Sequence, residues 1–124
     1  MRVFEKNGKF NFVDENDVLV GYDSEQDCCE HAGWFVADKV IGHEPDTPEP
    51  SGEQLLPYRF DYSLGYQEVE VEDDWLDQGG CVAFRLVAEG KPDLYLHLFN
   101  CQNGFYSHGF EVSIKGEVKD CDQL

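Results

Sequence analysis

The sequence predicts an α+β domain: a mainly antiparallel sheet of about five to seven strands with one α-helix packed against it. Two observations lead to this prediction. Apolar residues recur with a helical period in one stretch only, 24–38, and most of the other apolar segments alternate with polar residues or form short runs bounded by turn residues. The 124 residues show no internal repeat or change of composition, so we expect a single domain spanning 1–124.

The first strands flank the acidic turn DEND at 14–17. Apolar residues alternate with other residues over 10–12 and over 18–22, which predicts a hairpin. A calcium loop does not fit, because Val18 stands where the third ligand would be required. We therefore interpret 14–17 as a turn.

The predicted helix covers 24–38, SEQDCCEHAGWFVAD, with Ser24 as its N-cap and acidic residues in its first turn. At about 100° per residue its apolar side chains share one arc, which should face the core. They are Cys28, Cys29, Ala32, Phe35 and Val36. Trp34 projects on the opposite side, as an anchor for a partner or under a neighbouring loop. Gly33 weakens a helix by roughly 1 kcal/mol relative to alanine, so this helix should depend on packing.

The segment 42–57 contains four of the five prolines and no lysine or arginine, which predicts an irregular acidic loop. Two further strands should follow, around a turn near Gly65. The second would present a row of three carboxylates: Glu68, Glu70 and Glu72. Such a row is either a docking edge or, more commonly, a charged guard against edge-to-edge aggregation.

The segments 81–88 and 94–101 are apolar at nearly every position, as in central strands covered on both faces. Between them, EGKP is typical of a turn. Asn103-Gly104 predicts a second hairpin, with a final strand to about Lys115 and an acidic tail after it. A type I′ turn there would place His97 opposite Phe110 and diagonal to His108.

Charge limits the classes of partner. The chain has 26 acidic and nine basic residues, a net charge of −17, which repels nucleic acid and anionic membrane surfaces and attracts a basic protein surface. The alternative is that acidity only keeps the protein soluble. No apolar run approaches the ~20 residues of a membrane span, and the start of the chain lacks the apolar core of a signal peptide. We expect a cytoplasmic protein whose five cysteines are thiols.

One alternative function is a metal- or thiol-dependent site. If the helix packs on the face that carries His97 and His108, further ligands could complete it, namely Cys28, Cys29 and His31. The spacing does not support this strongly, because no second C-x-x-C or H-x-x-x-H pair is present. Isolated thiols and histidines on aromatic faces are more often core residues. We therefore expect no cofactor.

Catalysis by a thiol is also weakly supported. A helix N-terminus would lower the pKa of Cys28 or Cys29, but the neighbouring acids would raise it. The sequence contains no G-x-S-x-G, P-loop or G-x-G-x-x-G motif. An enzyme is thus the less favoured class.

The favoured class is a non-enzymatic protein-binding module of inhibitor, immunity or regulatory type. Its binding surface would combine the three carboxylates Glu68, Glu70 and Glu72 with Trp34 or Trp75, because aromatic residues dominate interface hot spots.

Two pieces of the chain, YDSEQDCCEHAGWF and LFNCQNGFYSHGFE, resemble a bacterial and phage group of small proteins with no assigned function. In that group an acidic residue, two cysteines and a glutamate open a helix, and an Asn-Gly-aromatic-aromatic hairpin follows. The resemblance covers about a quarter of the chain. It implies a helix packed on hairpins and implies no activity.

Overall fold

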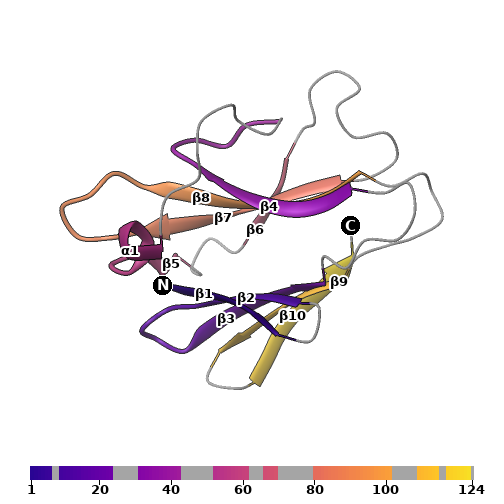
Figure 1. Ribbon diagram of the computed structural model, residues 1–124, viewed down its shortest axis with the longest axis horizontal. Helices are drawn as coiled ribbons and strands as arrows, with labels where there is room; N and C mark the ends of the chain where they lie inside the picture. Colours follow the sequence, from indigo (N-terminus) through magenta and orange to yellow (C-terminus); the bar gives the residue numbers. More distant parts are fainter. Residues whose placement is uncertain are drawn as a thin grey trace.

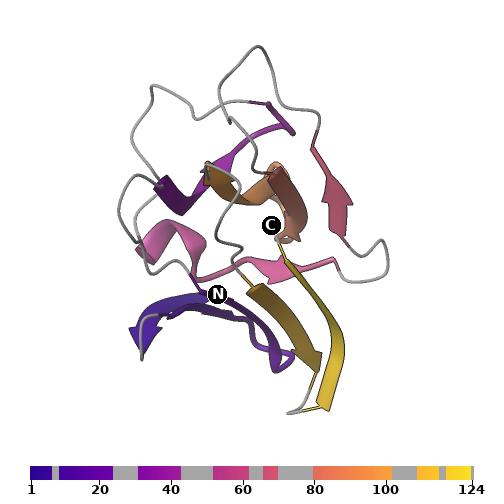
Figure 2. The same cartoon turned by 90° about the vertical axis from the view of Figure 1, so that its right-hand side faces the viewer.

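The described part of the chain consists of ten β-strands and one short helix. The computed structural model describes residues 1–6, 9–23, 31–42, 52–61, 66–69, 80–101, 109–114 and 117–123. Two antiparallel sheets of five strands lie face to face as the two layers seen in Figures 1 and 2. This two-layered arrangement buries the alternating side chains of both sheets against each other.

Sheet A has the order β1-β2-β3-β9-β10. Its strands are β1 (Arg2–Lys6), β2 (Lys9–Val13), β3 (Val18–Asp23), β9 (Gly109–Ile114) and β10 (Glu117–Gln123). Sheet B has the order β4-β8-β7-β5, and β6 also pairs with β7. Its strands are β4 (His31–Ala37), β5 (Arg59–Phe60), β6 (Tyr66–Glu68), β7 (Gly80–Val87) and β8 (Leu94–Cys101). Helix α1 (Gly52–Leu55) lies beside the N-terminus in Figure 1.

The main core lies between the sheets and follows from period-two alternation. Sheet A contributes Phe12, Val20, Tyr22, Phe110 and Val112, and sheet B contributes Val36, Val82, Phe84, Leu86, Leu96 and Leu98. The Tyr22 hydroxyl also donates a hydrogen bond of 2.7 Å to the Phe99 carbonyl, which ties the two layers together.

A second apolar cluster covers the outer face of sheet B. Its buried members are Phe35, Val69, Cys81, Ala83 and Phe99, with Ala37, Val40 and Ile41 packed against them. Strands β7 and β8 are therefore covered on both faces, as their continuous apolar sequences predict. The predicted strands 81–88 and 94–101, the turn between them and the first hairpin around 14–17 are all confirmed.

The predicted α+β class is wrong. No described helix reaches seven residues, and residues 31–37 of the expected helix form strand β4, which pairs with β8. In β4, Trp34 and Val36 face the inner core, and Phe35 and Ala37 face the outer cluster. A strand that is apolar on both faces has apolar residues at spacings that also fit one side of a helix, so periodicity alone misassigned it. Residues 24–30 lie outside the described ranges.

The expected β8–β9 hairpin is also wrong in its pairing. Phe110 lies opposite Tyr22 of β3, and His97 lies opposite Phe35 and Ala83, so β8 and β9 belong to different sheets. The expected acidic tail is strand β10 over 117–123, at the edge of sheet A. Asn103-Gly104 lies outside the described residues. The predicted irregular segment 42–57 includes helix α1, and 43–51 lies outside the described ranges.

Candidate functional site

The strand ends define two different ends of the sandwich. At the first, which we call the acidic end, β3, β6 and β8 finish and β4, β7 and β9 begin; it is the right-hand end in Figure 1. The registers agree, because His31 and Gly80 lie beside the last residues of β8, and Phe110 lies opposite Tyr22 near the end of β3. Segments 24–30, 70–79 and 102–108 of the chain are attached at these strand ends.

The sequence of these segments gives the acidic end its charge. Segment 24–30 has three acidic residues and segment 70–79 has five, together eight of the chain's 26, and neither has a lysine or arginine. The four described residues that flank these two segments, Asp23, His31, Val69 and Gly80, all lie at this end of the molecule. A large share of the net charge of −17 thus belongs to chain that starts and finishes there.

The opposite, amino-terminal end is held by hydrogen bonds between elements distant in sequence. The Met1 α-amine donates to the carbonyls of Leu55, Leu56 and Tyr58 at 2.8, 2.8 and 2.9 Å. Burial lowers the pKa of this amine, while the carboxylates of Asp14 and Glu15 oppose that shift. The amine therefore acts as a structural donor.

Asp14 connects the 14–17 turn to sheet B. Its Oδ1 accepts hydrogen bonds from the backbone N–H of Asn16 at 2.9 Å and of Val18 at 3.0 Å. Its Oδ2 accepts from the N–H of Phe60 at 2.9 Å. All three partners are backbone donors, so this buried carboxylate is a turn cap and not a metal ligand.

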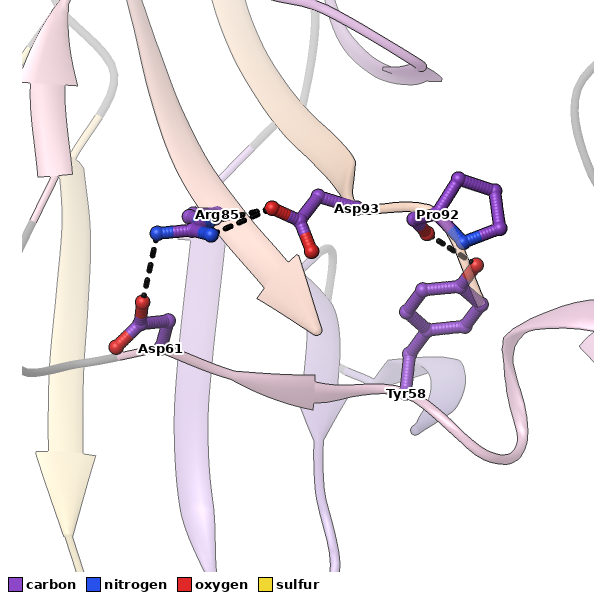
Figure 3. A network of polar contacts seen from close by, with 5 residues as sticks. All are labelled: Tyr58, Asp61, Arg85, Pro92 and Asp93. Carbon is purple, nitrogen blue, oxygen red and sulfur yellow. Dashed lines mark hydrogen bonds and ion pairs between the residues drawn. The ribbon is translucent and has the colours of Figure 1, made fainter. Parts of the chain in front are cut away.

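A polar network lies on the outer side of sheet B (Figure 3). Arg85 of β7 donates from Nε to Asp93 at 2.9 Å and pairs through a terminal nitrogen with Asp61 at 3.2 Å. The hydrogen bond to Asp93 raises the pKa of the guanidinium. Because both neighbouring carboxylates bind it, Arg85 fastens β5, β7 and the start of β8 together.

Beside this network is a shallow, open cavity of ≈ 300 Å³. It is lined by Gln54, Tyr58, Lys91, Pro92 and Leu94. The Tyr58 hydroxyl donates to the Pro92 carbonyl at 2.7 Å, and its pKa is raised, first by burial and then by Asp93. The phenol therefore stays protonated at neutral pH and is not a general base. The volume is at the lower limit of ordinary ligand pockets.

His97, a candidate ligand, is a core residue whose ring nitrogens both have backbone partners. Nδ1 donates to the Tyr95 carbonyl at 3.0 Å, since a carbonyl can only accept, and Nε2 accepts from the Ile41 N–H at 3.2 Å. The ring stacks on Phe35 with centroids 4.3 Å apart. Burial lowers the pKa of His97 to about 4, and the bond to Tyr95 opposes that shift. A neutral, doubly hydrogen-bonded imidazole has no lone pair left for a metal.

The described free thiol is equally unreactive. Cys81 is buried in the outer cluster, and burial raises its pKa to about 12. A nucleophilic cysteine needs the thiolate form near neutral pH. Cys81 is therefore a packing residue.

The predicted site residues lie in different places. Trp34 is half-buried, and its ring contacts Phe10 and Phe12 across the inter-sheet space, with centroids 6.0 and 5.1 Å apart. Glu68 is exposed at the end of β6, and the backbone of His31 lies opposite Cys101 at the acidic end. The remaining candidates lie outside the described residues: Cys28, Cys29, Glu70, Glu72, Trp75 and His108.

Among the described residues, no three histidine, cysteine, aspartate or glutamate side chains come together as a metal-binding group. No helix in the described ranges combines the length and the apolar character needed to cross a membrane.

The sequence interpretation overlooked Asp14 and Arg85 as connecting residues. A single arginine within the apolar run of β7 was the available signal, because a charge in a covered strand needs a partner.

In comparisons with known proteins, no family model, curated protein or solved structure matches this chain.

Proposed function

We propose that this chain is a non-enzymatic binding module that presents the acidic end of the sandwich to a basic protein surface in the cytoplasm. The observation that supports the proposal is the shared attachment of segments 24–30 and 70–79, which carry eight acids and no lysine or arginine. Loops gathered at one end of a β-sandwich are a common binding arrangement, because a rigid scaffold positions variable chain.

The basic residues are divided between the two ends. Arg59, Arg85 and Lys91 belong to the amino-terminal half of sheet B, where Arg85 pairs with Asp61 and Asp93, whereas Lys6 and Lys9 lie opposite each other beside Asp23 at the acidic end. The eight acids of segments 24–30 and 70–79 outnumber these two lysines, so the acidic end keeps an excess of negative charge. An uneven field steers a basic partner to one end and increases its association rate, particularly at low salt.

A charge-neutralisation experiment separates this proposal from a role in solubility alone. One variant carries Glu70→Gln, Glu72→Gln, Asp73→Asn and Asp74→Asn in segment 70–79. The matched control carries Glu15→Gln, Asp17→Asn, Glu53→Gln and Glu89→Gln, exposed acids at the amino-terminal end. Both variants lose the same charge, and lysozyme serves as the folded basic probe.

We expect the first variant to bind the probe at least about tenfold more weakly at low salt, and the control to bind within about twofold of the unmodified chain. Titration calorimetry at several salt concentrations measures both affinities, and the unmodified chain should lose affinity steeply as salt rises. Equal losses in the two variants would mean that only the total charge matters, which would refute a localised binding end.

A further inference from the structure

Among the described strands, β4 is an outer strand of sheet B that lacks the sequence features which usually block edge pairing. Within the described residues it pairs on one side only, with β8, in an unbroken register of seven residues. Its sequence, HAGWFVA, contains no Asp, Glu, Lys, Arg or Pro. Natural edge strands are normally blunted by such residues, by bulges or by shortness, because an exposed edge recruits further strands.

The other outer strands show these devices. Strand β1 carries Arg2, Glu5 and Lys6. Strand β10 has a register shift between Val118 and Asp120 and is rich in charged residues. Strands β5 and β6, which share the far side of β7, are two and three residues long. Among the described strands, β4 is therefore the long outer strand that has no charged residue, proline or bulge to block pairing with another strand.

The hydrogen bonds of sheet B identify which backbone groups of β4 point outward. The N–H groups of Asp61 and Val69 bond to the carbonyls of Arg85 and Cys81, so odd residues of β7 face β5 and β6. Because backbone groups alternate in direction along a strand, the even residues of β7 form hydrogen bonds with the even residues of β8. The odd residues of β8 then form hydrogen bonds with the odd residues of β4. The backbone groups directed away from β8 belong to Ala32, Trp34 and Val36.

We propose that this edge is a self-association surface, on which β4 pairs antiparallel with β4 of a second copy of the chain. Pairing about a two-fold axis at Trp34 sets Trp34 opposite its own equivalent and Ala32 opposite Val36. Each of these is a hydrogen-bonded position, so the outward groups of both copies are matched. The result is one continuous sheet of antiparallel strands through both molecules.

The chemistry of the edge favours a second copy as its occupant. A strand without charge cannot select a basic partner electrostatically, and backbone groups with apolar side chains are best matched by a strand of the same kind. Every copy supplies such a strand in self-complementary register, and a two-fold interface closes without forming a filament. One edge-to-edge contact is small, so the dimer should be weak.

Salt dependence distinguishes this interface from the proposed binding of a basic protein. Two chains of net charge −17 repel each other, so screening should strengthen the dimer, whereas it should weaken binding of a basic partner. We expect sedimentation equilibrium to show a monomer–dimer equilibrium whose dissociation constant falls at least about tenfold between about 0.02 M and about 0.5 M salt. A single monomeric mass at millimolar protein and high salt would overturn the proposal.

A proline variant locates the contact. Ala32→Pro removes an outward N–H and should weaken the dimer at least about tenfold while β4 keeps its bonds to β8. The matched control is Glu5→Pro on the outer strand of sheet A. In sheet A the Asp14 N–H donates to the Val18 carbonyl, so the backbone groups of even residues of β2 face β3 and those of odd residues face β1. Odd residues of β2 lie opposite even residues of β1, so the N–H of Glu5 points away from β2, toward the outside of the sheet. The control should dimerise like the unmodified chain.

Amide hydrogen exchange on the unmodified chain gives a second measurement that needs no variant. The amides of Ala32, Trp34 and Val36 should become more protected as protein concentration rises. If the dimer forms and these three amides keep the same exchange rate at all concentrations, another surface is responsible and the proposal fails.

Discussion

Single side chains in this molecule mostly serve the fold, and His97 shows how. The sequence interpretation held two views of it, a metal ligand and a core residue with satisfied hydrogen bonds. The structure gives it backbone partners at both nitrogens, on Tyr95 and Ile41. Its burial could be expected from the apolar run around it, but Ile41 lies 56 residues away in sequence and no local pattern indicates that contact.

His97 should make the protein less stable in mild acid. Its folded-state pKa of about 4 lies below the unfolded value of 6.5, so unfolding takes up a proton between these values. The stabilising contribution is complete above pH 6.5 and is lost as pH falls toward 4, by about 3 kcal/mol in total. Urea titrations from pH 4 to 8 measure it.

The variant His97→Phe serves as the reference for that pH dependence. It retains an aromatic ring against Phe35 but cannot titrate, and it leaves the Ile41 N–H without its acceptor, so it should be less stable above pH 6.5. Subtracting its pH curve removes the effect of the carboxylates, which titrate in the same range. Parallel curves for the two proteins between pH 4.5 and 6.5 would contradict the assignment.

Among elements, β4 shows where pattern analysis succeeds and fails. The first hairpin, β7 and β8 could be predicted, because their apolar residues alternate or run continuously between turn residues. Strand β4 could not, because Trp34 and Val36 on one face and Phe35 on the other form a run that fits a helix as well. Residues 31–37 form a strand because they pair with β8, which lies about 60 residues later in the chain.

The variant Gly33→Ala distinguishes a strand from a helix at this position. In a helix alanine would add about 1 kcal/mol of stability. In β4 the new Cβ would lie 3.2 Å from Cζ of Phe99, a ring that is 1% exposed and has little space to move. We expect a loss of about 1 kcal/mol or more in the free energy of unfolding, measured by urea denaturation.

A double-mutant cycle tests the cause of that loss. Phe99→Leu removes the ring atom that the alanine would meet, so Gly33→Ala should cost less in that background than in the unmodified chain. An equal cost in both backgrounds would show that the contact with Phe99 is not the reason.

For the whole molecule, the two layers are joined by a few contacts that cross long stretches of sequence. Tyr22 reaches Phe99, Asp14 reaches Phe60, and the Met1 amine reaches Leu55. None of these partners is indicated by local sequence, which is why two separate sheets were not expected. The acidic end could not be predicted for the same reason. The acids near the start of the expected helix and the carboxylates of Glu70 and Glu72 were noted in the sequence, but the common attachment of segments 24–30 and 70–79 depends on which strands pair.

The Met1 contact leads to a prediction for the whole fold. Two residues added before Met1 would replace an ammonium that donates to three carbonyls with an amide that has one N–H, at a position where the Met1 side chain is 4% exposed. Carbonyls that lose a buried donor destabilise the protein by about 1 to 3 kcal/mol. We expect a lower midpoint in thermal unfolding, whereas the same two residues added after Leu124 serve as the control. If both extensions shift the midpoint equally, the α-amine does not hold the amino-terminal end together.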